Sequence, residues 1–137
     1  MRNNSKPMII VDSSVWIDYF NGQSTPQTDL LDQLLTTQPI AIGNLILTEV
    51  LQGFRQDSDY KTAKHLLTNL TVFNFLEADL AIKSADSFRT LRKQGITVRK
   101  TIDVIIATFC LENNHELLFA DRDFLPLVDR LGLKSVL

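Results

Sequence analysis

The sequence predicts a three-layer α/β/α fold, in which helices cover both faces of a central, mostly parallel sheet. Short apolar runs rich in branched residues alternate along the chain with longer stretches whose apolar residues recur at helical spacing. No linker rich in Gly, Ser or Pro and no internal repeat divides the 137 residues. We therefore expect a single domain over residues 1–137, large enough to bury its own core.

The predicted strands are short apolar segments that end at polar or turn-forming residues. The first strand, 8–11, follows Pro7 and stops at Asp12. Strand 72–75 alternates apolar and polar residues, and strand 116–120 is mainly apolar. The other strands are expected at 40–42 and, as an edge strand, at 134–137.

The predicted helices combine apolar residues at helical spacing with helix-ending residues. Segment 28–37 places its four leucines on one stripe, and Pro39 ends the helix. Gly95 closes a long helix over 77–94. The remaining helices are expected at 15–20, 45–54, 58–70, 101–113 and 124–131.

Composition excludes several classes of protein. Hydrophobic residues make up 45% of the chain and charged residues 22%, a balance typical of globular proteins. The longest apolar runs are much shorter than the ~18–20 residues that a membrane span needs, and Asp12 interrupts the apolar stretch near the N-terminus. The single cysteine, Cys110, allows no internal disulfide. We expect a cytoplasmic protein that does not contact membranes.

Four carboxylates stand at positions that point to one crevice. Asp12 follows the first strand and Asp121 follows strand 116–120, and ligands of parallel sheets bind at the carboxyl ends of strands. Glu49 and Asp103 are acids within otherwise apolar helices that could reach the same place. Each acid also has a structural interpretation. Asp12 and Asp103 could cap helices, Asp121 could start a turn with Asp123, and Glu49 would need a partner if buried.

If these acids lie close together, their negative charges repel one another and favour the binding of a cation. Two carboxylates ~4 Å apart repel by ~4 kcal/mol at an effective dielectric constant near 20, so a group of them must take up protons or bind a metal ion. Oxygen donors alone favour Mg²⁺ or Mn²⁺. Zinc is not expected, because His65 and His115 lie in unrelated polar contexts and are predicted to be surface residues.

Four motifs together resemble a known family. They are MIIVDSSVWIDYF (8–20), TEVLQG (48–53), GITVRKTIDVIIA (95–107) and ADRDF (120–124). In this order and spacing the chain is similar to PIN domains, in particular to the VapC-type toxin ribonucleases of type II toxin–antitoxin pairs. The resemblance covers nearly the whole chain. It implies a metal-dependent endoribonuclease that acts on RNA, forms a homodimer and is silenced by a cognate antitoxin.

The resemblance also implies a set of site residues. Matched motif by motif, the catalytic and metal-binding acids are Asp12, Glu49, Asp103 and Asp121. Asp123 lies close to the last of them and is interpreted as a supporting or merely exposed residue. The cofactor implied is Mg²⁺ or Mn²⁺.

A basic segment is hidden in the nearly neutral total charge of −2. Residues 83–100 contain six bases and one acid, so this segment carries +5 and the rest of the chain −7. Arg92 and Lys93 lie three and four residues after Arg89 and share a helix face with it, while Arg99 and Lys100 directly precede the helix of Asp103 and are expected to rim the crevice. The predicted RNA-binding residues are Arg92, Lys93, Arg99 and Lys100. The alternative for Arg92 and Lys93 is a solvated helix face.

Two other functions stay open from the residues alone. A Mg²⁺-dependent phosphatase of the haloacid-dehalogenase type also places an aspartate after its first strand, but it would need a second aspartate where Ser14 stands. A non-catalytic RNA-binding module would result if the acids were too far apart to share a cation.

Overall fold

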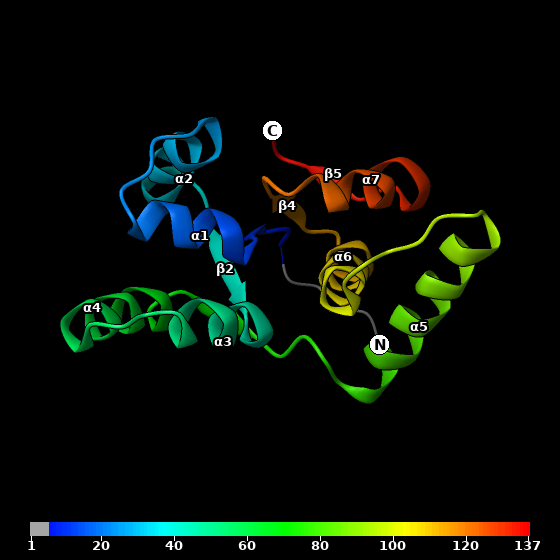
Figure 1. Cartoon of the computed structure of the whole chain (residues 1–137), viewed down its shortest axis with the longest axis horizontal. Helices are drawn as coiled ribbons and strands as arrows, with labels where there is room; N and C mark the ends of the chain where they lie inside the picture. Colours follow the sequence, from blue (N-terminus) through cyan, green and yellow to red (C-terminus); the bar gives the residue numbers. More distant parts are fainter. Residues whose placement is uncertain (1–5) are drawn as a thin grey trace.

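The computed structural model describes residues 6–137, in which strands and helices alternate along the chain (Figure 1). Five strands form one sheet in the order β3-β2-β1-β4-β5, and each pair of neighbours is parallel. The strands are β1 (Ile9–Val11), β2 (Ile40–Gly43), β3 (Thr71–Phe73), β4 (Glu116–Leu118) and β5 (Lys134–Ser135). Because all of them are parallel, their carboxyl ends lie along the same edge of the sheet.

Helices lie on both sides of this sheet, and the predicted three-layer α/β/α fold is confirmed. Figure 1 shows the first four helices on one side and the last three on the other. The helices are α1 (Ser13–Phe20), α2 (Pro26–Thr37), α3 (Asn44–Gln52), α4 (Asp57–Thr68), α5 (Ala78–Lys93), α6 (Thr101–Asn113) and α7 (Leu125–Leu131), with a 3-10 helix η1 (Arg122–Phe124) before α7. None of the described helices is long and apolar enough to cross a bilayer.

Helix α6 lies at the centre of the apolar core. All eight residues from Asp103 to Cys110 are buried, so the helix is enclosed on every side. Burial raises the pKa of the Cys110 thiol well above its usual range, which keeps the thiol protonated. Cys110 is therefore a small core residue, and Asp103 is an acid at the buried start of the same helix.

Most elements differ from the predicted bounds by one or two residues at an end, and three of them illustrate the differences. Helix α2 starts at Pro26, two residues earlier than predicted, because Thr25 and Thr28 form a capping box: each side-chain oxygen accepts the other's backbone N–H, at 3.0 and 2.8 Å. Strand β4 stops at Leu118. The helix predicted over 124–131 is α7, which starts one residue later, at Leu125, and is preceded by the separate 3-10 helix η1.

The prediction that both histidines lie on the surface is wrong for His115. His65 is exposed, but His115 is buried and stacks on the rings of Phe73 and Phe109, with ring centroids 5.2 and 5.7 Å away. Its Nδ1 accepts a hydrogen bond from the Met8 amide at 2.9 Å. His115 therefore holds the start of β1 against the α6 side of the core.

Gly43 is expected to be essential for packing at the end of β2. A Cβ added there would collide with the ring of Phe75, which is fully buried. The φ of −85° suits alanine, so the effect of Gly43→Ala is purely steric. We expect this substitution to lower the free energy of unfolding by about 1–3 kcal/mol in urea titrations. Gly53→Ala is the matched control, since the nearest atom, the Val50 carbonyl oxygen, is 3.6 Å away; equal losses in both variants would contradict this account.

Candidate metal centre and its cationic rim

Three carboxylates meet where α6 begins beside η1. Asp103 is the third residue of α6, Asp121 is the N-cap of η1, and Asp123 lies within η1. One oxygen from each of the three lies within 4.8 Å of the other two. In the part of the chain that the structure describes, these three side chains are the ones whose ligand atoms lie close enough together to share a metal ion. We call Asp103, Asp121 and Asp123 the acid cluster.

Asp12 faces the acid cluster from the end of the neighbouring strand. Its backbone N–H donates to the Leu118 carbonyl at 2.9 Å, which ties the end of β1 to the end of β4 just before Asp121. The Ser14 hydroxyl donates to Asp12 Oδ2 at 2.9 Å. Burial raises the pKa of Asp12; hydrogen bonds from Ser14 and the amides of Ser13 and Ser14 oppose this, and the charge of Asp121 adds to it. Asp12 is the N-cap residue of α1, but its side chain makes no capping hydrogen bond of normal geometry to these amides.

Asp103 has no structural partner. Its residue is 5% exposed, and its Oδ2 is buried without a hydrogen bond from any described residue. The helix-cap interpretation does not hold, because the N-cap of α6 is Lys100 and Asp103 lies inside the helix. The pKa of Asp103 is raised from 3.8 to about 7, mainly by burial; the charges of Asp12, Asp121 and Asp123 add to the rise, and the charge of Lys100 opposes it.

Glu49 reaches the same region from α3 but is less enclosed. Burial raises the pKa of its carboxyl; the Ser13 side chain lowers the pKa, the charge of Asp12 raises it, and Lys100 lowers it. Glu49 is thus close enough to Asp12 for the two charges to interact, although it is not part of the acid cluster. The neighbouring Thr48 hydroxyl instead donates to the Asn44 carbonyl within its own helix, at 2.9 Å.

Two bases rim the acid cluster. Lys100 Nζ lies 3.7 Å from Asp121 Oδ2, and Arg99 Nη2 lies 3.4 Å from Asp123 Oδ2. The second contact is close enough for an ion pair but lacks hydrogen-bond geometry, since Asp123 Oδ2 accepts no hydrogen bond from the described residues. Arg99 and Lys100 thus lie beside the acid cluster, at the position predicted from the sequence.

The other two predicted RNA-binding residues lie in the last turn of α5. Arg92 and Lys93 are exposed, and the Arg92 guanidinium lies over the Phe88 ring, 5.8 Å from its centroid. No ion pair joins either residue to the acid cluster among the described residues. Their position is compatible with contact to a long polyanion or with a solvated helix face.

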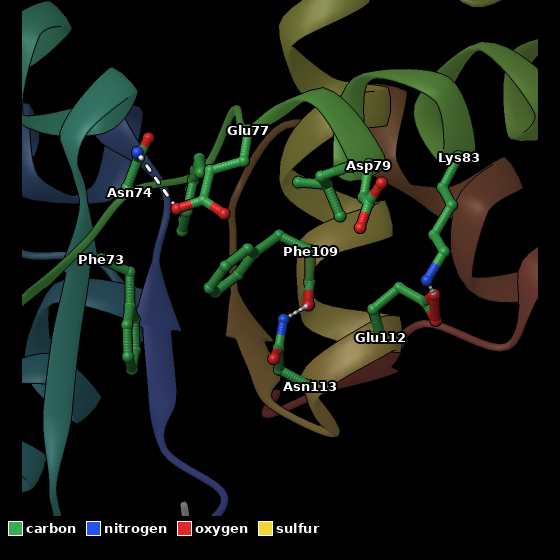
Figure 2. A pocket seen from close by; sticks show the side chains of 10 residues that line it. Phe73, Asn74, Glu77, Asp79, Lys83, Phe109, Glu112 and Asn113 are labelled. Carbon is green, nitrogen blue, oxygen red and sulfur yellow. Dashed lines mark hydrogen bonds and ion pairs between the residues drawn. The ribbon is translucent and has the colours of Figure 1, made fainter. Parts of the chain in front are cut away.

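A cavity of the described chain lies away from these acids. It has a volume of about 500 Å³ and lies between β3 and the adjoining ends of α5 and α6 (Figure 2). Figure 2 shows Glu112 paired with Lys83, and Asn74 bonded to Glu77. None of the predicted catalytic or RNA-binding residues lines this cavity, so it is not the candidate metal centre.

The residues present fit a divalent cation. All donors are carboxylate oxygens, the charges of Asp12, Asp121 and Asp123 help to raise the pKa of Asp103, and a buried Asp103 oxygen has no hydrogen-bond partner among the described residues. A cation would offset the repulsion and supply the missing partner. The arrangement also argues against a non-catalytic module whose acids are too far apart to share an ion.

The raised pKa of Asp103 predicts a pH-dependent stability of the metal-free protein. Asp103 binds its proton more tightly in the folded chain, so it stabilises the fold fully below about pH 4 and loses that contribution as pH rises towards 7. In urea titrations with EDTA, Asp103→Asn should gain roughly 1–4 kcal/mol relative to wild type between pH 4 and pH 8. Parallel pH profiles of the two proteins would contradict the assignment.

The PIN domain family model matches residues 9–129, and the chain belongs to the PIN domain family. Ribonuclease VapC11 of Mycobacterium tuberculosis is 29% identical over 119 residues, which cover 85% of this chain and 89% of the relative. The resemblance inferred from the four motifs is confirmed.

Solved structures share the same fold. VapBC2 from Rickettsia felis, bound to a DNA fragment from its promoter, aligns with a TM-score of 0.73 at 16% identity over 93% of this chain and 96% of that chain. DNA-bound VapBC from Salmonella typhimurium aligns with a TM-score of 0.73 at 16% identity, over 95% and 97%. At such low identity these structures establish the fold and leave the chemistry to the residues of this chain.

Proposed function

We propose that this protein is a metal-dependent endoribonuclease, the toxin of a type II toxin–antitoxin pair. The observation that carries the proposal is the acid cluster, with a buried Asp103 oxygen that no described residue satisfies. Its family and its similarity to ribonuclease VapC11 support RNA as the substrate. Mg²⁺ or Mn²⁺ is proposed as the cofactor because the donors are all carboxylates.

Each acid has a proposed role. Asp12, Asp103 and Asp121 would hold the cation with carboxylate oxygens, and Asp123 would complete the same group. When bound, the ion would act as a Lewis acid on the scissile phosphate and would lower the pKa of a coordinated water. Glu49 is half-buried and close enough to feel the charge of Asp12, and it would orient the attacking water as a general base.

Hydrogen bonds hold two of these acids in place before any ligand arrives. The Ser14 hydroxyl fixes Asp12 Oδ2, and the Asp123 amide donates to Asp121 Oδ1 at 2.9 Å. The second oxygen of Asp121 is thereby directed elsewhere, towards Lys100. Such preorganisation reduces the cost of binding a cation in a fixed geometry.

The proposed substrate contacts are basic. Arg99, Lys100, Arg92 and Lys93 are exposed and would bind backbone phosphates on either side of the cut. Exposed RNA loops suit such a site, because their unpaired bases can be splayed away from the phosphate to be cut. A cognate antitoxin and a second copy of the chain are proposed as protein partners, on the resemblance to VapC-type toxins.

RNA cleavage by the purified protein tests the proposed function. End-labelled RNAs with single-stranded loops and a matched duplex RNA would be incubated with Mg²⁺ or Mn²⁺, and the cut sites mapped. We expect internal cuts confined to unpaired positions. Intact RNA under all these conditions, or release of phosphate from small phosphomonoesters instead, would overturn the proposal in favour of a binding module or a phosphatase.

A further inference from the structure

We propose that Arg99 and Lys100 are built-in counter-ions of the acid cluster, which a metal ion displaces and which then bind the RNA backbone. The inference rests on the proposed function, because it assigns a metal ion to the acid cluster. It adds that metal binding and RNA binding assist each other through these two side chains.

The contacts pair one base with one acid. Lys100 Nζ lies 3.7 Å from Asp121 Oδ2, while Asp121 Oδ1 is already occupied by the Asp123 amide. Arg99 Nη2 lies 3.4 Å from Asp123 Oδ2. Asp121 Oδ2 is therefore the oxygen that either Lys100 or a metal ion can take. Asp103, deeper in the site, has neither base beside its Oδ2.

The charges indicate that the acid cluster is neutralised either by the two bases or by a metal ion. Arg99 and Lys100 together carry +2, the same charge as one divalent cation. A metal ion at the acid cluster would repel both side chains at short range, and it would remove the carboxylate charge that holds them. The two bases and the ion therefore compete for the same acids.

Exposure makes the displacement easy. The Arg99 side chain is 76% exposed and that of Lys100 55%, and ion pairs at such positions are weak. Once released, both side chains project from the rim of the site, where a phosphate backbone would pass. By thermodynamic linkage, a metal ion that frees these bases tightens RNA binding, and bound RNA tightens metal binding by the same factor.

Arg89 provides a matched control within the same basic segment. It lies on α5, is exposed, and has no ion pair with the acid cluster among the described residues. Arg89→Gln removes one positive charge, as do Arg99→Gln and Lys100→Gln. A difference between these variants reports on contact with the acids rather than on net charge.

The first test is calorimetric titration of Mn²⁺ into the full-length protein. We expect Arg99→Gln and Lys100→Gln each to bind Mn²⁺ about 3- to 10-fold more tightly than wild type, and Arg89→Gln to stay within about 2-fold. Unchanged or weaker binding in Arg99→Gln and Lys100→Gln would overturn the inference. Wild type that binds no Mn²⁺ would instead contradict the proposed metal centre, so the two failures are distinct.

The second test measures the release of the bases. Binding of a single-stranded DNA oligonucleotide, checked to be intact afterwards, would be followed over a range of salt concentrations with and without saturating Mn²⁺. For wild type we expect Mn²⁺ to steepen the log–log salt slope by about 1.4, which is about 0.7 for each of two new phosphate contacts. The double variant Arg99→Gln/Lys100→Gln should show no such steepening. Equal steepening in both proteins would refute the exchange.

Discussion

Asparagine in place of Asp103 should lower RNA cleavage by at least two orders of magnitude without weakening the metal-free fold. The amide keeps one weaker oxygen donor and loses the charge that attracts the cation. Asp103 is buried, crowded by Asp12, Asp121 and Asp123, and unpaired at Oδ2. Removing its charge therefore relieves repulsion, and the metal-free melting temperature near pH 7 should rise, corresponding to a gain of about 1 kcal/mol or more.

The two readouts separate a metal ligand from a structural residue. Single-turnover cleavage rates and thermal unfolding in EDTA would be measured on the same preparations. Asp86→Asn is a suitable control, because Asp86 is an exposed acid on α5 outside the acid cluster. Full cleavage by Asp103→Asn would defeat the ligand assignment, and lost cleavage with a clear drop in metal-free stability would favour a structural role.

Removal of divalent cations should abolish cleavage reversibly. Without a cation, the carboxylates of the site repel a phosphate, and no group remains to lower the pKa of an attacking water. EDTA should suppress RNA cleavage to background, and an excess of Mg²⁺ or Mn²⁺ should restore it. Circular dichroism in EDTA should show an unchanged fold, since no described strand or helix depends on an ion for its hydrogen bonds. Undiminished cleavage in EDTA would rule out the metal-dependent mechanism.

Local patterns predicted most of the fold because they matched the burial that tertiary packing imposes. Helix α6 agrees with its predicted range of 101–113, since its apolar residues and the following asparagine define both ends. The start of α2 was predicted two residues late, because its capping box uses a second threonine, Thr28, in place of the more usual Glu or Gln.

His115 shows where local patterns fail. Its neighbours are polar, which suggested a surface position, but Asn114 takes up a left-handed conformation with φ of 57° and ends α6. The chain then turns into β4, and His115 packs against Phe73, more than forty residues earlier in the sequence. Such a contact depends on strand order, which no local pattern contains.

The acids were identified from their positions after strands and within apolar helices, but their grouping required the structure. Sequence alone left Asp123 between a supporting and an exposed role, since its direction depends on the 3-10 turn at Asp121. It also placed Arg99 and Lys100 on the rim without showing which acid each would face. Both depend on the packing of η1 beside the start of α6.

Anomalous X-ray diffraction from a crystal soaked in Mn²⁺ tests the metal centre most directly. The account predicts an anomalous difference peak among Asp12, Asp103 and Asp121, at coordination distance from their carboxylate oxygens, with Lys100 moved away from Asp121 and Arg99 moved away from Asp123. In Asp103→Asn crystals the peak should be weak or missing. A fully loaded wild-type crystal with no peak at these residues, or with its ordered Mn²⁺ bound elsewhere, would contradict the account.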